Sequence, residues 1–324
     1  MNFEFTARRR EFSCTADLSH ELSPIFGSQL ISTKPENYRS LLGYQRIDPY
    51  TELLWGKHSC LSGVLMPKKV YVFTIQRGGG GSFYNGYHVD PVQDPLAIMV
   101  SPVDLKCDLS VREGYSSLSV LIDSVQFEYL YESLSHQSVD KLLAKPIVRF
   151  KSAQDKEFFL ALVIPFTKNE SLGLQGGKPS RGDGGRIVET LIQGLELEGA
   201  PLKRSLCRTI ALKAHERIIV SPDCKIGLAE ICKDLGVASR SLQQGFKDLY
   251  GMGFIEYHRL YRYHRFRQHV KKKGIGEGEV TSLMGMFGFE HAGRFSVEYK
   301  KIFGISPSKE KKREEDAQLL IPDL

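Results

Sequence analysis

A helix-turn-helix pattern that occurs twice between Leu228 and Pro307 constrains the fold of this chain more than any other feature. In the first copy, Leu228, Ile231 and Leu235 recur at helical spacing, and Gly236 follows where two helices need a left-handed turn residue between them. The next helix carries an inward apolar stripe at Leu242, Phe246 and Leu249. The pattern therefore predicts two short helices that cross at a steep angle.

The outward face of that second helix carries side chains suited to DNA. Arg240, Gln244 and Lys247 fall opposite the apolar stripe, and Gln243 lies on its flank. Arg and Gln have forked hydrogen-bonding groups that match the edges of guanine and adenine in the major groove. A solvated helix face is the alternative interpretation of this copy when it is considered alone.

The second copy favours the DNA interpretation. It places Gly288 at the turn and Phe295, Tyr299 and Ile302 on the inward face. Between the copies, the segment from Phe254 to Val270 would form a helix of about 25 Å. Successive major grooves on one face of B-DNA lie about 34 Å apart, so one chain could hold a recognition helix in each.

The outward face of the second recognition helix differs from that of the first. Its groove-facing pole shows Gly293 and Val297, which can touch a thymine methyl group but cannot form a forked hydrogen bond with a base. We therefore expect the first motif to supply most base readout and the second mainly to hold phosphates. The predicted DNA contacts are Arg240, Gln243, Gln244, Lys247, His291, Arg294, Val297, Lys300 and Lys301.

Over about 100 residues the sequence resembles the DNA-binding domain of the AraC/XylS family of bacterial transcription regulators. The matching residues are Leu235-Gly236-Val237, Leu242, Phe246-Lys247 and Gly251, then Gly288-Phe289, Phe295, Tyr299-Lys300-Lys301, Phe303-Gly304 and Ser306-Pro307. Within the family, the sequence looks most like the branch that contains the ethanolamine-operon regulator. Cys232 and Met284 depart from the small Ala that the family usually has under the recognition helix.

The distribution of charge agrees with a polyanionic partner. From Lys203 to Arg313 there are 23 Lys and Arg residues against 11 Asp and Glu, a net charge of +12, whereas the rest of the chain carries −6. A fold alone does not need this asymmetry, but a DNA-binding surface does. The densest basic stretch, from His258 to Lys273, could also be a membrane-surface helix, but its position between the two motifs favours contact with the DNA backbone.

The N-terminal half shows short β-rich runs. Eight of them are predicted as strands, at residues 52–55, 60–65, 70–75, 81–84, 87–89, 96–100, 107–109 and 117–122. This spacing predicts a small barrel or jelly roll. Together with the resemblance, it implies the cupin-like effector-binding barrel that many AraC-type regulators carry. The aromatic residues expected to line an effector pocket are Trp55, Tyr71, Phe73, Phe83, Tyr84, Tyr87 and His88.

Helices are predicted after the barrel, at residues 125–134, 155–168 and 187–198. The resemblance implies that this helical segment forms a homodimer, although packing onto its own barrel is an open alternative for the apolar stripe from Ile187 to Leu195. We therefore expect an α+β multidomain chain. Its predicted parts are an effector-binding and dimerisation domain at 1–200, with a barrel at about 50–123 and helices at about 125–200, an all-α DNA-binding domain at 201–310, and a tail at 311–324.

The cysteines and histidines show no metal-ligand spacing, so we expect neither a metal site nor a cofactor. Six cysteines without CxxC spacing, no apolar leader after Arg10, and no run of 18 apolar residues predict a cytoplasmic, nucleoid-associated protein that is not bound to membranes.

The expected function is regulation of transcription through double-stranded DNA, with a possible small-molecule effector. Activation through RNA polymerase is what the resemblance implies. We do not expect an enzyme, and the alternatives are a cupin-type metal enzyme fused to a DNA-binding domain and an architectural DNA binder without sequence preference.

Overall fold

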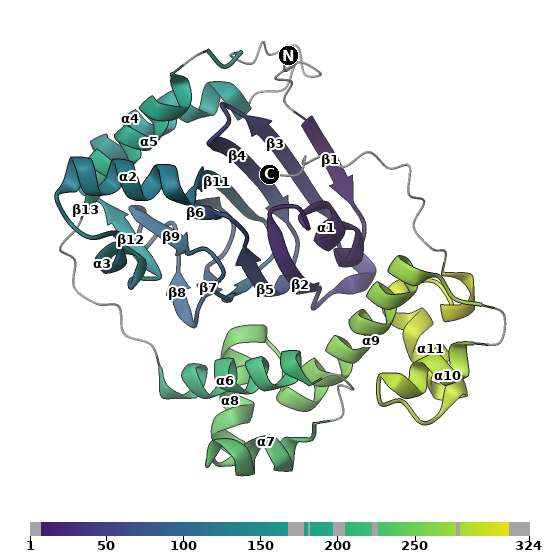
Figure 1. The fold of residues 1–324 in the computed structure, drawn as a ribbon. Coiled ribbons are helices and arrows are strands. Elements are labelled where there is room, and N and C mark those ends of the chain that lie inside the picture. The colour runs from purple at the N-terminus through teal and green to yellow at the C-terminus, as the bar shows by residue number, and fades with distance from the viewer. Residues whose placement is uncertain are drawn as a thin grey trace.

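The structure is a computed structural model that describes residues 8–167, 178–180, 182–196, 205–221, 226–276 and 279–310. Figure 1 shows a sheet-rich N-terminal domain followed by a helical C-terminal domain, as the sequence predicted. Cys224, the tail at 311–324 and, within the Gly-rich segment at 171–186, residues 171–177 and 181 lie outside the described residues. From Asp183 onward, the end of that segment forms the first turn of a helix.

The strands form two antiparallel sheets. The larger sheet has the order β1 (Arg8–Phe12), β3 (Ser40–Arg46), β4 (Thr51–His58), β11 (Tyr115–Asp123), β6 (Val70–Gly78), β9 (Ala97–Ser101), β12 (Ile147–Phe150) and β13 (Leu195–Glu196). The smaller sheet has the order β2 (Phe26–Ile31), β5 (Leu61–Pro67), β10 (Cys107–Val111), β7 (Ser82–Tyr84) and β8 (Tyr87–Val89). All eight predicted strands are present.

The two sheets are not joined into a closed barrel. Each keeps two edge strands in the part of the chain that the structure describes, so the domain is a sandwich and the predicted cupin-like barrel is not confirmed. The sheets also extend beyond the predicted limits of 50–123. Strands β1, β2 and β3 come before residue 50, and β12 and β13 come after residue 123.

The larger sheet is buried on both faces. On β4, Leu54 points between the sheets, whereas its neighbour Leu53 points to the helical side. Alternate residues of a strand lie on opposite faces, so a sheet buried on both faces needs consecutive apolar residues. This explains the runs around Leu53 and around Tyr71 to Phe73.

Helices cover the outer face of the larger sheet (Figure 1). They are α2 (Ser124–Ser135), α3 (Val139–Leu143), α4 (Ala153–Val163), continued by the 3₁₀ turn η2 (Ile164–Thr167), and α5 (Asp183–Gly194). On α5, Ile187, Leu191 and Ile192 are buried in this same core. The stripe that we considered for dimerisation therefore packs on its own domain, which was the open alternative.

Two shorter elements complete the N-terminal domain, α1 (Thr15–Glu21) and the 3₁₀ turn η1 (Pro35–Asn37). The C-terminal domain contains α6 (Leu206–Val220), α7 (Leu228–Leu235), α8 (Ser239–Tyr250), α9 (Phe254–Lys273), α10 (Val280–Met286), α11 (Ala292–Phe303) and η4 (Pro307–Lys309). Helices α7–α8 and α10–α11 are the two helix-turn-helix motifs, and α9 joins them (Figure 1).

Candidate DNA-binding surface

The first motif is a compact helical unit. Ile231 on α7 and Leu242 and Phe246 on α8 are completely buried against one another and against α6. Gly236 ends α7 with a φ of +61°, in the left-handed region that a side chain would strain. The predicted turn and inward stripe are therefore confirmed in the structure.

Helix α8 crosses α6 at a very close approach, which depends on Gly245. A Cβ atom added to Gly245 would lie 2.0 Å from the carbonyl oxygen of Cys207 and 2.9 Å from the Cβ of Ala211. Both neighbours belong to α6, and the nearer is a backbone atom that cannot rotate away. The position of α8 in the domain therefore depends on a residue without a side chain.

The second motif repeats this arrangement. Phe295 and Tyr299 on α11 are buried, and Gly288 has a φ of +74° in the turn before that helix. Met284 on α10, one of the departures from the family pattern, is buried in the same core. An unbranched, flexible side chain can fill such a space, so the larger residue is absorbed by packing.

Helix α9 is the rod between the motifs. Its 20 residues correspond to about 30 Å, slightly longer than predicted. Phe254 and Tyr257 pack in the core of the first motif, whereas Phe266 and Val270 pack in the core of the second. Each end of one continuous helix is therefore anchored in a different motif, which fixes the orientation of one motif relative to the other.

Two arginines of the basic stretch on α9 have partners within the fold. Arg262 donates a hydrogen bond from Nη1 to the carbonyl oxygen of Gly288 at 2.7 Å. Arg267 pairs with Glu310 at 2.7 Å and lies over the ring of Phe303. These two arginines hold the second motif on the rod, and contact between the basic stretch and the DNA backbone stays a prediction.

On α8, Arg240, Gln244 and Lys247 are exposed, as predicted. Gln244 donates to the carboxylate of Asp248 at 2.8 Å. Gln243 is different, because its Oε1 accepts a hydrogen bond at 3.0 Å from the backbone N–H of Phe254. Gln243 therefore satisfies the first turn of α9, so one acceptor site of its side-chain oxygen is used within the fold.

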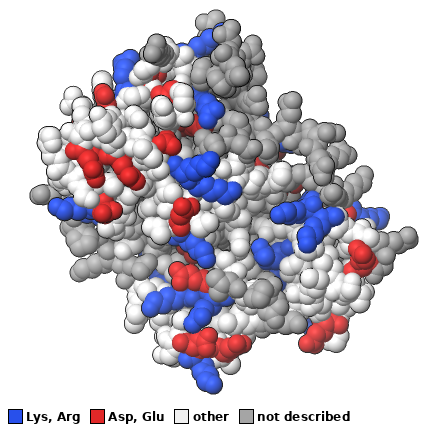
Figure 2. All heavy atoms as spheres, in the orientation of Figure 1, with Lys and Arg blue, Asp and Glu red and all other residues white. Residues whose placement is uncertain are grey.

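The predicted contacts around α11 are also on the surface. His291, Arg294, Val297, Lys300 and Lys301 are all exposed. Val297 is 71% exposed, so its methyl groups are open to contact from outside the protein. Figure 2 shows Lys and Arg side chains near α9 and the second motif, with Asp and Glu interspersed.

The first motif is docked on the smaller sheet by a buried polar cluster. The carboxylate of Asp108 on β10 lies 3.0 Å from Nδ1 of His215 on α6 and 3.0 Å from the hydroxyl of Tyr250. The hydroxyl of Tyr257 lies 3.0 Å from the other ring nitrogen of His215. Burial and the charge of Asp108 raise the pKa of Tyr250 and of Tyr257, so both hydroxyls stay protonated.

Helix α9 is docked on the N-terminal domain through His264. Its Nδ1 lies 3.1 Å from the hydroxyl of Thr15, and its Nε2 lies 3.3 Å from the backbone nitrogen and 3.2 Å from the oxygen of Ser32. Burial lowers the pKa of His264 to about 3, so the ring is neutral at pH 7. The sequence contained no signal for either docking cluster, because the partners are far apart along the chain.

The aromatic residues that we predicted for one effector pocket lie in different places. Tyr71 and Phe73 are buried under α2, and Tyr84 is buried between the sheets. Phe83 packs in the core of the first motif, beside His88. Trp55 and Tyr87 line two further, separate hollows. Neighbouring residues of a strand point to opposite faces, so these seven residues do not gather around one cavity.

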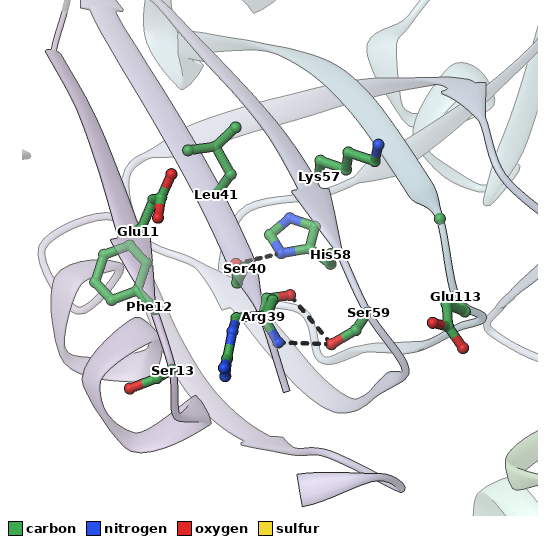
Figure 3. Close-up of a pocket in the computed structure, with 11 residues that line it drawn as sticks. Glu11, Phe12, Ser13, Arg39, Ser40, Leu41, Lys57, His58, Ser59 and Glu113 are labelled. Carbon is green, nitrogen blue, oxygen red and sulfur yellow. Dashed lines mark hydrogen bonds between the residues drawn. The ribbon is translucent and has the colours of Figure 1, made fainter. Parts of the chain in front are cut away.

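A cavity of about 640 Å³ lies instead at the end of β1, β3 and β4 (Figure 3). Its lining includes two cationic side chains, Arg39 and Lys57, and the two carboxylates of Glu11 and Glu113. Figure 3 shows His58, whose Nδ1 lies 2.6 Å from the hydroxyl of Ser40. Burial lowers the pKa of His58 to about 4. The cavity therefore offers neutral and charged hydrogen-bonding groups to a small polar molecule.

Among the described residues, no group of three or more His, Cys, Asp or Glu could hold a metal ion. The five described cysteines are free thiols. No described helix is both long and apolar enough to cross a membrane.

Comparison with known proteins agrees with the duplicated motif. Residues 231–313 match the family model described as a helix-turn-helix domain. A probable thc operon regulatory protein of Rhodococcus erythropolis is 34% identical over 83 residues, which make up 26% of this chain and 25% of that protein. The match thus spans about a quarter of this relative. The family match confirms a helix-turn-helix domain at residues 231–313, and the duplicated geometry agrees with the resemblance of this domain to the AraC/XylS type.

Two of the solved structures that match have low sequence identity to this chain. The AraC-like transcriptional activator CuxR is 12% identical with a TM-score of 0.41, over 86% of this chain and 99% of that chain. ToxT from Vibrio cholerae is 12% identical with a TM-score of 0.30, over 94% of this chain and 97% of that chain.

Proposed function

We propose that this protein is a sequence-specific, DNA-binding transcription regulator. The observation that carries the proposal is the pair of helix-turn-helix motifs anchored at the two ends of α9, with the outer faces of α8 and α11 exposed. The rod of about 30 Å is close to the separation of successive major grooves, so both recognition helices can engage one duplex. A cytoplasmic location and activation through RNA polymerase belong to the proposal as features of the AraC/XylS type.

The N-terminal domain contributes two further parts of the proposal. The cavity beside His58 is the site that we infer for a small polar effector, since the predicted aromatic pocket is dispersed. Homodimerisation would use the outer faces of α2 and α4, because Val125, Tyr129 and Phe158 remain exposed there. The alternative of a metal enzyme fused to a DNA-binding domain is tested by metal analysis of the purified protein.

Arg240 is expected to read a base. It is the second residue of α8, and the first residues of a recognition helix are those that reach base edges. Arg240→Ala should cost about 1 to 3 kcal/mol of binding free energy and relax the preference at one base pair. Titrations of the full-length protein with a selected DNA site and its single-base variants measure both effects.

Lys301→Ala is the matched control for that experiment. Lys301 is exposed near the end of α11, where a cation contacts phosphate, so its loss should weaken binding to all sequences alike. The salt dependence of the binding constant should also fall by about one unit of slope. A base-specific loss from Lys301→Ala would contradict this assignment of the two residues.

A further inference from the structure

The two motifs can be aligned through their cores, and one aligned position differs sharply. Leu242 and Phe246 on α8 correspond to Phe295 and Tyr299 on α11, since each pair is separated by four residues and buried. Gly245 then corresponds to Glu298. In the first motif this position allows α8 to touch α6. In the second motif it places a carboxylate between α11 and α9.

Both oxygens of that carboxylate are bonded. The Oε2 of Glu298 accepts a hydrogen bond at 3.0 Å from the hydroxyl of Tyr263, and its Oε1 accepts one at 3.0 Å from Nε of Arg294. Nη1 of Arg259 lies 3.9 Å from Oε2. Partial burial acts to raise the pKa of Glu298, but the bonds from Arg294 and Tyr263 and the charge of Arg259 outweigh it and lower that pKa. Glu298 is therefore ionised at pH 7.

Tyr263 gives this carboxylate a fixed orientation. The tyrosine is buried on α9, where its ring lies 4.4 Å from the ring of Phe289 and 5.3 Å from that of Phe295, measured between centroids. An ordinary ion pair between residues four apart on a helix surface contributes only about 0.2–0.5 kcal/mol and leaves both side chains mobile. Here Tyr263 on α9 holds the Glu298 carboxylate in place, so Arg294 donates its hydrogen bond to an acceptor with a defined position.

This arrangement leaves the two Nη groups of Arg294 available to a base. The arginine is 72% exposed and uses Nε for Glu298, and no residue in the described ranges bonds its two Nη groups. Those two groups form the fork that matches O6 and N7 of guanine. Arg294 is also the third residue of α11, near the end of a recognition helix that reaches base edges.

We propose that Arg294 reads a guanine in the second half-site, and that Glu298, held by Tyr263, is the residue that positions it. The proposal rests on the proposed function, because it requires α11 to lie in a major groove. The proposal differs from our sequence-based prediction, in which the first motif supplies most base readout and the second motif mainly holds phosphates. An arginine fixed at Nε loses less side-chain entropy when it binds a base than a free arginine does.

The test is selection of bound sequences from a random DNA pool by the full-length protein and its variants, followed by titration at fixed salt. Arg294→Ala should abolish the preference for guanine at one position of one half-site and leave the other positions unchanged. Glu298→Ala should reduce that same preference about tenfold, because the guanidinium is no longer held. The Glu298→Ala variant should bind non-specific DNA as tightly as the wild type or more tightly, because a negative charge near the phosphates is lost.

Two conservative variants separate position from charge. Glu298→Gln removes the same charge as Glu298→Ala, but its amide oxygen can still accept from Nε, so it should retain most of the guanine preference. Tyr263→Phe keeps the packed ring and should weaken the preference partially. Equal behaviour of the Gln and Ala variants would overturn the positioning role of Glu298, and a uniform loss on all sequences from Arg294→Ala would overturn base readout. A wild-type protein without any sequence preference would instead refute the proposed function itself.

Discussion

Lowering the pH from 7 to 5 is expected to reduce the free energy of unfolding by about 2 kcal/mol through His264 alone. The folded protein holds this imidazole neutral between Thr15 and Ser32, with a pKa of about 3, whereas an unfolded chain has a histidine pKa of about 6.5. The unfolded state therefore binds more protons below pH 6.5. The stability contributed by this depressed pKa is complete above pH 6.5 and declines as the pH falls toward 3.

The measurement is the free energy of unfolding in urea at a series of pH values, for the wild type and for His264→Gln. The glutamine is neutral at every pH, so the variant should lose about 1.2 kcal/mol less than the wild type between pH 6 and 5. Arg267, one turn further along α9, adds repulsion to a protonated ring. His136→Asn, at an exposed left-handed position after α2, is the control and should follow the wild type. Parallel curves for the wild type and His264→Gln would contradict the account.

Gly245→Ala is expected to destabilise the first motif by about 1 to 3 kcal/mol or more, even though alanine normally favours a helix over glycine. The added methyl group would lie 2.0 Å from the carbonyl oxygen of Cys207, so α6 and α8 would have to separate. Thermal unfolding should show a lower midpoint, and specific DNA binding should fall with it because α8 carries Arg240.

Gly285→Ala provides the matched control in the second motif. Gly285 lies within α10 and has no atom within 4 Å of an added Cβ. The substitution should therefore be neutral or stabilise the protein by up to about 1 kcal/mol, as removal of a helical glycine does in open space. If both substitutions destabilised the protein equally, the close contact between α6 and α8 would not be the reason that position 245 needs a glycine.

The elements that the sequence predicts well are those with local signals. Strands β4 to β11 combine short apolar runs with turn residues, and all were predicted within a few residues of their observed limits. The turn glycines Gly236 and Gly288 were also predicted, because only a left-handed residue joins two helices at that angle. Strands β1 to β3 were missed, since residues 8–46 mix polar and apolar positions without a clear period.

The features that sequence could not supply depend on distant partners. The basic residues of α9 were interpreted as DNA contacts, but Arg262 and Arg267 bind the second motif through Gly288 and Glu310. A charged residue in an amphipathic pattern looks the same whether its partner is a phosphate or another part of the fold. Likewise, the spacing places Gln243 on the outward flank of α8. In the structure its Oε1 accepts a hydrogen bond from the backbone N–H of Phe254 at the start of α9.

The candidate surface itself was predicted in outline but not in its inner connections. Arg240, Gln244 and Lys247 are exposed on one helix because they lie opposite a buried stripe, which is a local property. The link from Tyr263 through Glu298 to Arg294 joins two helices. The spacing of four residues between Arg294 and Glu298 was the one signal for it in the sequence, and that spacing is common on exposed helices.

The central claim is that one rigid rod holds two recognition helices in successive major grooves of a single duplex. It is tested most directly by measuring the affinity of the full-length protein for its selected site, with about 5 or about 10 base pairs inserted between the two half-sites. The account predicts that both insertions reduce the affinity to that of a single half-site, because α9 can neither lengthen nor rotate. Unchanged affinity for both inserted sites would contradict it.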